Sequence, residues 1–166
     1  MNTIANRPTF ERHQNYFACG LVVVGRPAED GRVLSVMASS FNSVSLSPRL
    51  VMWCVWKGDS AVAPLAVGAS CGLSVLAADH RGLWPQCRQA GAAHGFKWRR
   101  GGTLDVPLVD GAAACFEVAV TLHIDQGDHD LYVGEVASFA YLASCDGLLS
   151  YLDRLRVPCL QEQAAG

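Results

Sequence analysis

The chain has 166 residues, of which 51% are hydrophobic and 17% are charged, and its formal net charge at pH 7 is −2. That length suits one domain with a sizeable core, and the composition excludes an intrinsically disordered chain. The basic residues are scattered, and the one cluster, KWRR at 97–100, is too short for a nucleic-acid groove, so we expect no nucleic-acid partner.

The sequence carries no signal for a membrane span or for secretion. No window holds about 18 uninterrupted apolar residues, and the N-terminal stretch MNTIANRPTFERHQNYF lacks the layout of a signal peptide. The seven cysteines form no CxxC pair, and several lie in apolar runs such as MWCVW and AACFEV, where Cys acts as a small buried hydrophobe. We therefore expect a cytoplasmic, reduced protein with no membrane contact, no bound metal and no disulfide framework.

The first part of the chain contains three runs that favour β-strands. Residues 17–25 and 31–38 are β-branched or aliphatic, and the RPAEDG segment between them suits a turn that joins antiparallel strands. Residues 50–56, LVMWCVW, form the third run. These runs predict a hairpin followed by a further strand.

The middle of the chain is less regular. A short helix is expected at 59–69, with Asp59 or Ser60 as its N-cap. Residues 71–79, CGLSVLAAD, predict another strand. In 80–100, helix-forming residues are interrupted by Pro and Gly, so we expect only short helical turns there.

The clearest hairpin lies at 114–142. Apolar residues alternate with other types from Phe116 to Ile124, which is the pattern of a half-buried strand, and DQGDHD supplies the turn. Roughly six strands with only a few short helices predict a mainly β protein, built as an antiparallel barrel or sandwich.

The connection at 37–50, MASSFNSVSLSPRL, is rich in serine, and two interpretations stay open. It is a surface turn whose hydroxyls bond their own backbone, or it binds a ligand. In the second case, hydroxyls and successive backbone N–H groups form a concave donor array that suits a phosphate or the carbonyl edge of a flavin.

His129 lies between Asp128 and Asp130 in GDHD. The segment is a polar hairpin turn, or a histidine at a strand mouth that donates a hydrogen bond to a cofactor or positions a nicotinamide. The remaining histidines have no comparable setting. We interpret them as structural or surface residues: His13, His80, His94 and His123.

Two further groups have both a ligand-binding and a structural interpretation. Lys57 and Ser60 are a phosphate site at the start of the expected helix, or a solvated lysine and a helix cap. Tyr151 and Arg154 are a dinucleotide-binding edge, or part of an amphipathic segment. The sequence has no GxSxG, GxGxxG or GxxxxGK[ST] motif, so any chemistry is expected to come from a bound cofactor.

Four segments together resemble the short-chain flavin reductase family, the reductase components of two-component flavin monooxygenases. SSFNSVSLSPR at 39–49 is similar to that family's N-S-F-T-S-V-S-L-D-P-P, and SVLAAD at 74–79 is similar to its N-V-L-A-x-x. GDHDLYVGEV at 127–136 matches G-D-H-T-x-x-x-G-E-V, and GLLSYLDRL at 147–155 aligns with P-L-L-Y-Y-R-G-R-Y.

The resemblance implies a flavin reductase-like domain at 14–157, between an N-terminal extension at 1–13 and a C-terminal tail at 158–166. The implied fold is mainly β, an antiparallel split β-barrel of Greek-key type with a few short helices. Proteins of this kind dimerise and hold FMN or FAD at the subunit interface, so a homodimer is expected.

The implied activity is that of an NAD(P)H-dependent flavin reductase. Hydride passes from the nicotinamide C4 of NADH or NADPH to N5 of FMN or FAD, and the reduced flavin leaves for a transiently associated monooxygenase. His129 is the expected catalytic residue, and it faces the nicotinamide together with the segment that starts at Tyr151. The expected cofactor-binding residues are Ser39, Ser40, Phe41, Asn42, Ser43, Val44, Ser45, Lys57, Ser60, Tyr151 and Arg154.

Several positions depart from the family pattern. Ser39 stands where the family has Asn, and Ala61 stands where a phosphate-binding Thr is common. Leu152 and Asp153 occupy the place of the Arg-Gly pair in R-G-R-Y. Two other readings therefore stay open: a flavin or haem binding protein without reductase activity on the same barrel, and an interaction module with an empty pocket.

Overall fold

The computed structural model describes residues 19–58, 64–83, 95–142 and 148. These residues form strands and one short 3₁₀-helix, as the sequence pattern predicts for a mainly β protein. The elements are β1 (Val22–Pro27), β2 (Val33–Ala38), β3 (Asn42–Leu46), β4 (Arg49–Trp56), β5 (Ser70–Val75), η1 (Ala78–Leu83), β6 (Trp98–Arg100), β7 (Pro107–Val109), β8 (Ala114–Gln126) and β9 (His129–Tyr141).

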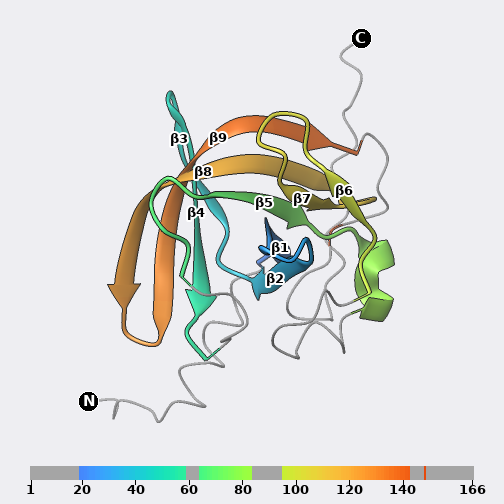
Figure 1. Ribbon diagram of the computed structural model, residues 1–166, viewed down its shortest axis with the longest axis horizontal. Coiled ribbons are helices and arrows are strands. Elements are labelled where there is room, and N and C mark those ends of the chain that lie inside the picture. Colours follow the sequence, from blue (N-terminus) through green and yellow to red (C-terminus); the bar gives the residue numbers. More distant parts are fainter. Residues whose placement is uncertain (1–18, 59–63, 84–94, 143–147, 149–166) are drawn as a thin grey trace, which may run out of the picture.

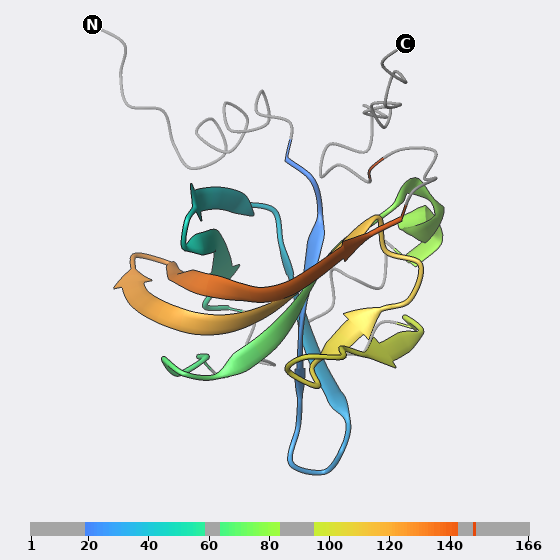
Figure 2. The same ribbon diagram turned by 90° about the horizontal axis from the view of Figure 1, so that it is seen from above.

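One strongly curved antiparallel sheet organises the molecule (Figure 1), with the strand order β2-β1-β5-β8-β9-β4-β3. Its long strands β8 and β9 run side by side across the molecule, and the separate β6–β7 pair lies beside one end of them (Figure 2). The curvature brings β2 into contact with β4. Because the hydrogen-bonded order ends at β2 and β3, the barrel is open between those two strands.

The apolar run LVVV at the start of the fold is explained by two cores on opposite sides of β1. Val22 and Val24 point into the barrel, where Trp53 is fully buried. Leu21 and Val23 point the other way, into a second cluster beneath the β6–β7 pair. Since successive side chains of a strand alternate between its faces, a strand covered on both sides needs a continuous apolar sequence.

The hairpin predicted at 114–142 is confirmed. Strands β8 and β9 meet at a two-residue turn, Gly127 and Asp128, with Gln126 paired to His129. Gly127 has φ 58°, a left-handed conformation that suits glycine at the first central position of a type II′ turn. Register shifts occur at two places along the hairpin, and such bulges bend a ladder.

Glu117 ties the β6–β7 pair to the main sheet. Its buried carboxylate accepts hydrogen bonds from the backbone N–H groups of Gly102, Thr103 and Leu104, at distances from 2.6 to 3.2 Å. A Cβ at Gly101 would lie 2.4 Å from this carboxylate. A buried carboxylate is costly without such donors, so the loop and Glu117 depend on each other.

Three expectations about local structure are wrong in the described residues. Residues 42–46, expected within a connecting loop, form strand β3. Residues 64–69 are not helical, because the N–H of Gly68 and the carbonyl of Ala69 bond to Val120 and so continue the contact with β8. Residues 98–100 form strand β6 rather than a helical turn. No helix among the described residues has the length and hydropathy that a bilayer span requires.

A glycine in β5 tests how closely β7 packs on the sheet. A Cβ at Gly72 would lie 2.1 Å from the carbonyl oxygen of Pro107 and 2.7 Å from Leu108. Gly72→Ala is therefore expected to lower the free energy of unfolding by roughly 1–3 kcal/mol through overpacking, measured by urea denaturation. Gly82→Ala is the matched control, since nothing lies within 4 Å of its Cβ position. Equal stability of the two variants would contradict this packing.

Candidate functional site

The serine-rich segment is anchored at its start. The backbone N–H of Cys54 donates to the Ser40 hydroxyl at 2.9 Å, and the Phe41 ring packs on Phe116 with centroids 5.4 Å apart. Ser40 therefore continues the β3 side of the sheet alongside β4, and Phe41 fills the barrel. The start of the segment is therefore fixed to the sheet by the Ser40 hydroxyl and the Phe41 ring.

Beyond this anchor, the segment becomes an edge strand with an irregularity. The β3–β4 pairing shifts register between Ser43 and Ser45, and Asn42, Ser43 and Val44 are exposed. An edge strand leaves one row of backbone N–H and C=O groups without a ladder partner. The segment is thus a bulged edge strand instead of a loop, and its predicted contact with a phosphate or a ring edge stays a prediction.

The register of the sheet places His129 on its outer face. On that face three rows of side chains cross β4, β9 and β8: Trp56–His129–Gln126, Cys54–Leu131–Ile124 and Met52–Val133–Leu122. Because Ser40 bonds to Cys54 and His129 lies opposite Trp56, strand β4 brings the serine-rich segment and His129 into adjacent rows. Two motifs that are far apart in the sequence are therefore close in the fold.

The His129 ring is held from one side. Its Nδ1 lies 2.7 Å from a carboxylate oxygen of Asp128, and 46% of its side chain is exposed. A carboxylate only accepts hydrogen bonds, so this contact places a proton on Nδ1. The remaining nitrogen, Nε2, is then an acceptor in the neutral ring and a donor in the charged ring.

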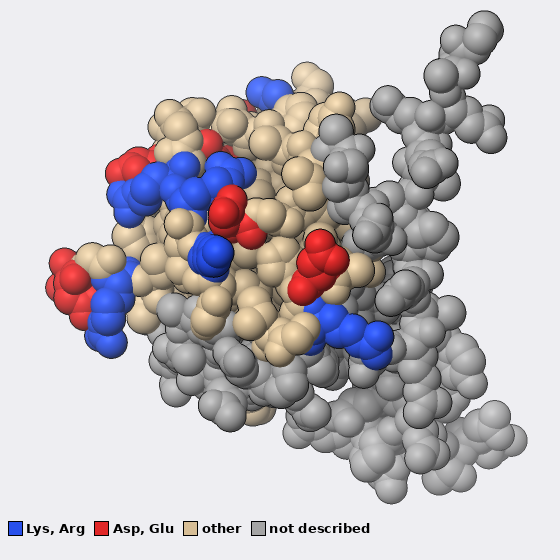
Figure 3. Space-filling model, turned by 90° about the vertical axis from the view of Figure 1, so that its right-hand side faces the viewer, with Lys and Arg blue, Asp and Glu red and all other residues tan. Residues whose placement is uncertain are grey.

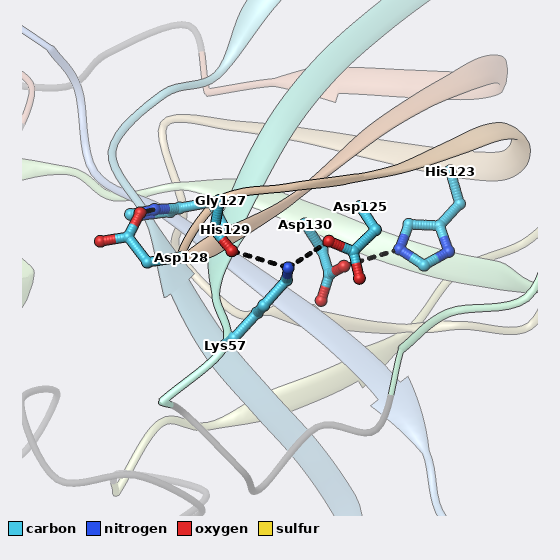
Figure 4. A network of polar contacts seen from close by, with 7 residues as sticks. All are labelled: Lys57, His123, Asp125, Gly127, Asp128, His129 and Asp130. Atoms are coloured by element: carbon cyan, nitrogen blue, oxygen red, sulfur yellow. Dashed lines mark hydrogen bonds and ion pairs between the residues drawn. The ribbon is translucent and has the colours of Figure 1, made fainter.

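Lys57 contacts the hairpin turn next to His129 (Figure 4). Its Nζ donates to the carbonyl oxygen of Gly127 at 2.8 Å and also to the Asp125 carboxylate. The ammonium that donates to Asp125 lowers the pKa of that carboxyl, so this interaction is lost as the pH falls through the lowered pKa. An ammonium has three donors, and the predicted contact of Lys57 with a phosphate stays a prediction.

The inner face of the same strands carries a partly buried polar pair that the sequence pattern does not indicate. His123, expected to be a structural or surface residue, has its Nε2 2.8 Å from Asp130. Its ring stacks on Tyr132 at 4.8 Å, and Tyr132 stacks on the buried Trp53 at 5.5 Å. Burial raises the pKa of Tyr132. Counting residues back from a two-residue turn would have placed His123 and Asp130 on one face, because that turn sets the register.

The other predicted site residues are placed as follows. Ser39 is partly buried at the start of the β2–β3 connection. Ser60, Tyr151 and Arg154 lie outside the described residues. In the part of the chain that the structure describes, no group of His, Cys, Asp or Glu side chains is arranged to hold a metal ion. Burial raises the pKa of the Cys71 thiol to about 12, which makes it an unreactive core residue.

Two ion pairs away from this region join residues that are close in the sequence. Arg32 lies 2.6 Å from Asp30, and Arg100 contacts Asp105 and holds the pKa of that carboxyl below its ordinary value. On the face drawn in Figure 3, positive and negative side chains lie next to one another rather than in separate patches. Charge on this face therefore offers no extended surface of one sign.

The chain matches known proteins over most of its length. Residues 14–156 match the family model described as flavin reductase like domain. The NADH-dependent flavin reductase of Rhodococcus sp is 33% identical over 132 residues, which cover 75% of this chain and 72% of that protein. The NADH-dependent FAD reductase of Streptomyces globisporus is 32% identical over 146 residues, covering 84% of this chain and 79% of that protein.

Solved structures share the same fold. BorF, the flavin reductase component of a bacterial two-component tryptophan halogenase, is 30% identical with a TM-score of 0.72, over 90% of this chain and 98% of that chain. The NADH:FAD oxidoreductase SgcE6 of Streptomyces globisporus C-1027, solved with NAD and FAD fragments, is 25% identical with a TM-score of 0.73, over 94% of this chain and 96% of that chain. These similarities confirm the expected split-barrel fold class.

The anchor of the serine-rich segment can be tested through stability. Ser40→Ala leaves the Cys54 amide without its acceptor, and we expect the free energy of unfolding to fall by about 1 kcal/mol, measured by urea denaturation. Ser43→Ala, at an exposed position of the same segment, is the control and should change stability by less than about 0.5 kcal/mol. An equal effect at both positions would mean that Ser40 is not the anchor.

Proposed function

Because this chain belongs to the flavin reductase like domain family, we propose that it is an NADH-dependent flavin reductase that reduces FMN or FAD. The reduced flavin leaves for a partner monooxygenase, with which the protein associates only transiently. The observation that carries the proposal is the family match at residues 14–156, together with the two motifs that β4 brings into adjacent rows. The names of the relatives favour NADH over NADPH.

The structure fits a flavin at the edge of the sheet. The exposed, bulged part of β3 offers backbone donors and hydroxyls from Asn42 to Ser45, and we assign the grip on the flavin to the segment from Ser39 to Ser45. We assign a phosphate contact to Ser60. The Lys57 ammonium already donates to Gly127 and Asp125, so we assign Lys57 to the hairpin turn instead. Bound flavin supplies the acceptor for a hydride from the nicotinamide; the protein holds the two rings at reacting distance and excludes water.

His129 is assigned the nicotinamide side of this site. With Nδ1 bonded to Asp128, its free Nε2 accepts a hydrogen bond from a carboxamide N–H of the nicotinamide when the ring is neutral. Tyr151 and Arg154 line the same side by the family resemblance. This division gives flavin binding to the β3 edge and nicotinamide orientation to the hairpin tip.

We further propose that the protein is a homodimer in the cytoplasm. Large apolar side chains are exposed on the outer face of the sheet, among them Trp56 at 50%, Leu122 at 44% and Ile124 at 36%. Contiguous exposed apolar side chains of this kind mark an interaction surface. A second copy would cover this face and enclose a ring bound beside β4. Residues 14–157 form the domain in this proposal, flanked by an extension and a tail.

The activity and the role of His129 are tested together. Wild-type protein with FMN or FAD should oxidise NADH, followed by the loss of its near-ultraviolet absorbance. His129→Ala is expected to lower kcat/KM for NADH by roughly ten- to a hundredfold, since a positioned hydrogen bond in the reacting complex is lost. The flavin dissociation constant, measured by fluorescence quenching, should change little.

Gln126→Ala is the matched control for this variant, because Gln126 is exposed and lies directly opposite His129. It should keep the wild-type kinetics. No NADH oxidation above a protein-free blank with either flavin would refute the reductase. Tightly bound flavin without turnover would instead favour a flavin binding protein. Collapse of flavin binding in His129→Ala would overturn the assigned role.

The dimer is tested by placing a charge on the outer face. Ile124→Lys should convert a dimer into a monomer in sedimentation velocity, because a buried unpaired ammonium is costly. Val67→Lys is the control, since Val67 is 63% exposed in a turn outside the rows of the outer face. A wild-type monomer, or dimer formation unaffected by Ile124→Lys, would contradict the proposed interface.

A further inference from the structure

The hairpin tip that presents His129 is short and exposed, so its position depends on contacts with the rest of the fold. Gly127 and Asp128 form the turn, and both are exposed. The ladder pairs end at His129, which lies opposite Trp56 of β4 and Gln126 of β8, so the two turn residues lie beyond the paired strands. The tip is nevertheless connected to groups on the inner face of the sheet, opposite to the face that carries His129.

Lys57 makes the first set of contacts, which are with the two turn residues that immediately precede His129 in the chain. Its backbone N–H donates to the carbonyl oxygen of Asp128 at 2.9 Å, and its Nζ donates to the carbonyl oxygen of Gly127 at 2.8 Å. The same ammonium contacts Asp125 on β8. One residue at the end of β4 thus bonds to both carbonyls of the turn.

The second contact lies immediately after His129. Asp130 is only 8% exposed, and its carboxylate is held by His123 Nε2 at 2.8 Å. The His123 ring is fixed in turn by its stacking on Tyr132, with an interplanar angle of 11°. Buried carboxylates keep their partners because losing them is costly. His129 is therefore flanked on both sides by residues whose positions are fixed from the inner face (Figure 4).

We propose that Lys57 and His123 are positioning residues that fix the hairpin tip and thereby hold His129 in place for the nicotinamide. This inference rests on the proposed function, in which His129 orients the nicotinamide. Neither residue needs to touch the nucleotide. The positioning role of Lys57 depends on its backbone N–H and on the Nζ hydrogen that bonds to Gly127. This role does not require a contact between Nζ and a phosphate.

Kinetic consequences follow from where the contacts act. Loss of a contact lets the tip occupy other positions, so the fraction of protein with His129 in place falls. The efficiency with NADH then falls in proportion. Flavin affinity is unaffected, because the serine-rich segment has its own anchor in Ser40 and Phe41. Substitution of a residue that bound the flavin phosphate directly would instead lower flavin affinity and leave the efficiency with NADH nearly unchanged.

The experiment compares Lys57→Met, which keeps most of the side-chain stem and the backbone N–H, with Lys57→Arg, which restores a donor. We expect Lys57→Met to lower kcat/KM for NADH roughly threefold to fivefold, the size expected of a partly exposed ion pair. Lys57→Arg should recover part of that loss. Arg32→Met is the matched control, since Arg32 pairs with Asp30 at the β1–β2 turn, and it should behave as wild type.

A double-mutant cycle with His129→Ala decides whether Lys57 acts through His129. If it does, Lys57→Met has no further effect on NADH kinetics once His129 is absent. Additive losses would overturn the proposal. So would a loss of flavin affinity in place of NADH efficiency. His123→Phe keeps the ring stack on Tyr132 but removes the bond to Asp130. It should lower kcat/KM for NADH as Lys57→Met does, and it should have no further effect when combined with His129→Ala.

A measurement without turnover separates this inference from the reductase proposal. The amide at position 57 donates to Asp128, so its hydrogen exchange reports whether the tip is held. Exchange should be faster in Lys57→Met than in wild type, and unchanged in Arg32→Met. Unchanged exchange in Lys57→Met would refute the positioning role even if NADH is oxidised. Faster exchange in a protein that oxidises no NADH would refute the reductase and remove the nicotinamide from the inference.

Discussion

A two-residue turn at Gly127 and Asp128 sets the pairing register of β8 and β9, and the arrangement of the candidate site depends on that register. With Gln126 opposite His129, one set of side chains faces outward and the other set faces the barrel. A slip by a single residue would exchange the two sets. His129 would then point into the core, and Asp130 would lose the partner that makes its burial acceptable.

Buried carboxylates reinforce this register at both ends of the hairpin. Glu117 accepts backbone hydrogen bonds from the loop between β6 and β7, and Asp130 is bonded to His123. Each carboxylate has donors only in the native alignment, and an unpaired buried carboxylate is strongly unfavourable. The polar contacts therefore select one pairing, while the apolar side chains of the two cores provide most of the stabilising burial.

The candidate site is assembled around β4. This strand pairs with β3 on one side and with β9 on the other, so it separates the β3 edge, to which we assign flavin binding, from the hairpin tip by the width of one strand. Such spacing suits two ligands whose reacting rings must meet while their remaining parts lie apart. The exposed apolar rows on β4, β9 and β8 adjoin this region, so the proposed dimer would also enclose the proposed site.

Local patterns in the sequence were sufficient for part of this result. Alternation of apolar residues identified the 114–142 hairpin, and the order of the serine-rich and GDHD motifs identified the family. Short segments were less reliable: 64–69 and 98–100 were expected to be helical, but pairing with β8 and β7 decided their structure. Intrinsic secondary-structure propensity decides little in a short segment when a neighbouring strand supplies hydrogen bonds to its backbone.

Contacts between distant residues were decided by the tertiary structure alone. Lys57 and Asp125 are 68 positions apart, and nothing in either neighbourhood indicates the other. His123 lacked a motif and acquired its partner only through the hairpin register. The sequence by itself determined the motifs and the longer strands with clear patterns, because periodicity and turn residues are local properties. Only the fold decided which charged groups meet, because that depends on how separate strands are aligned in the curved sheet.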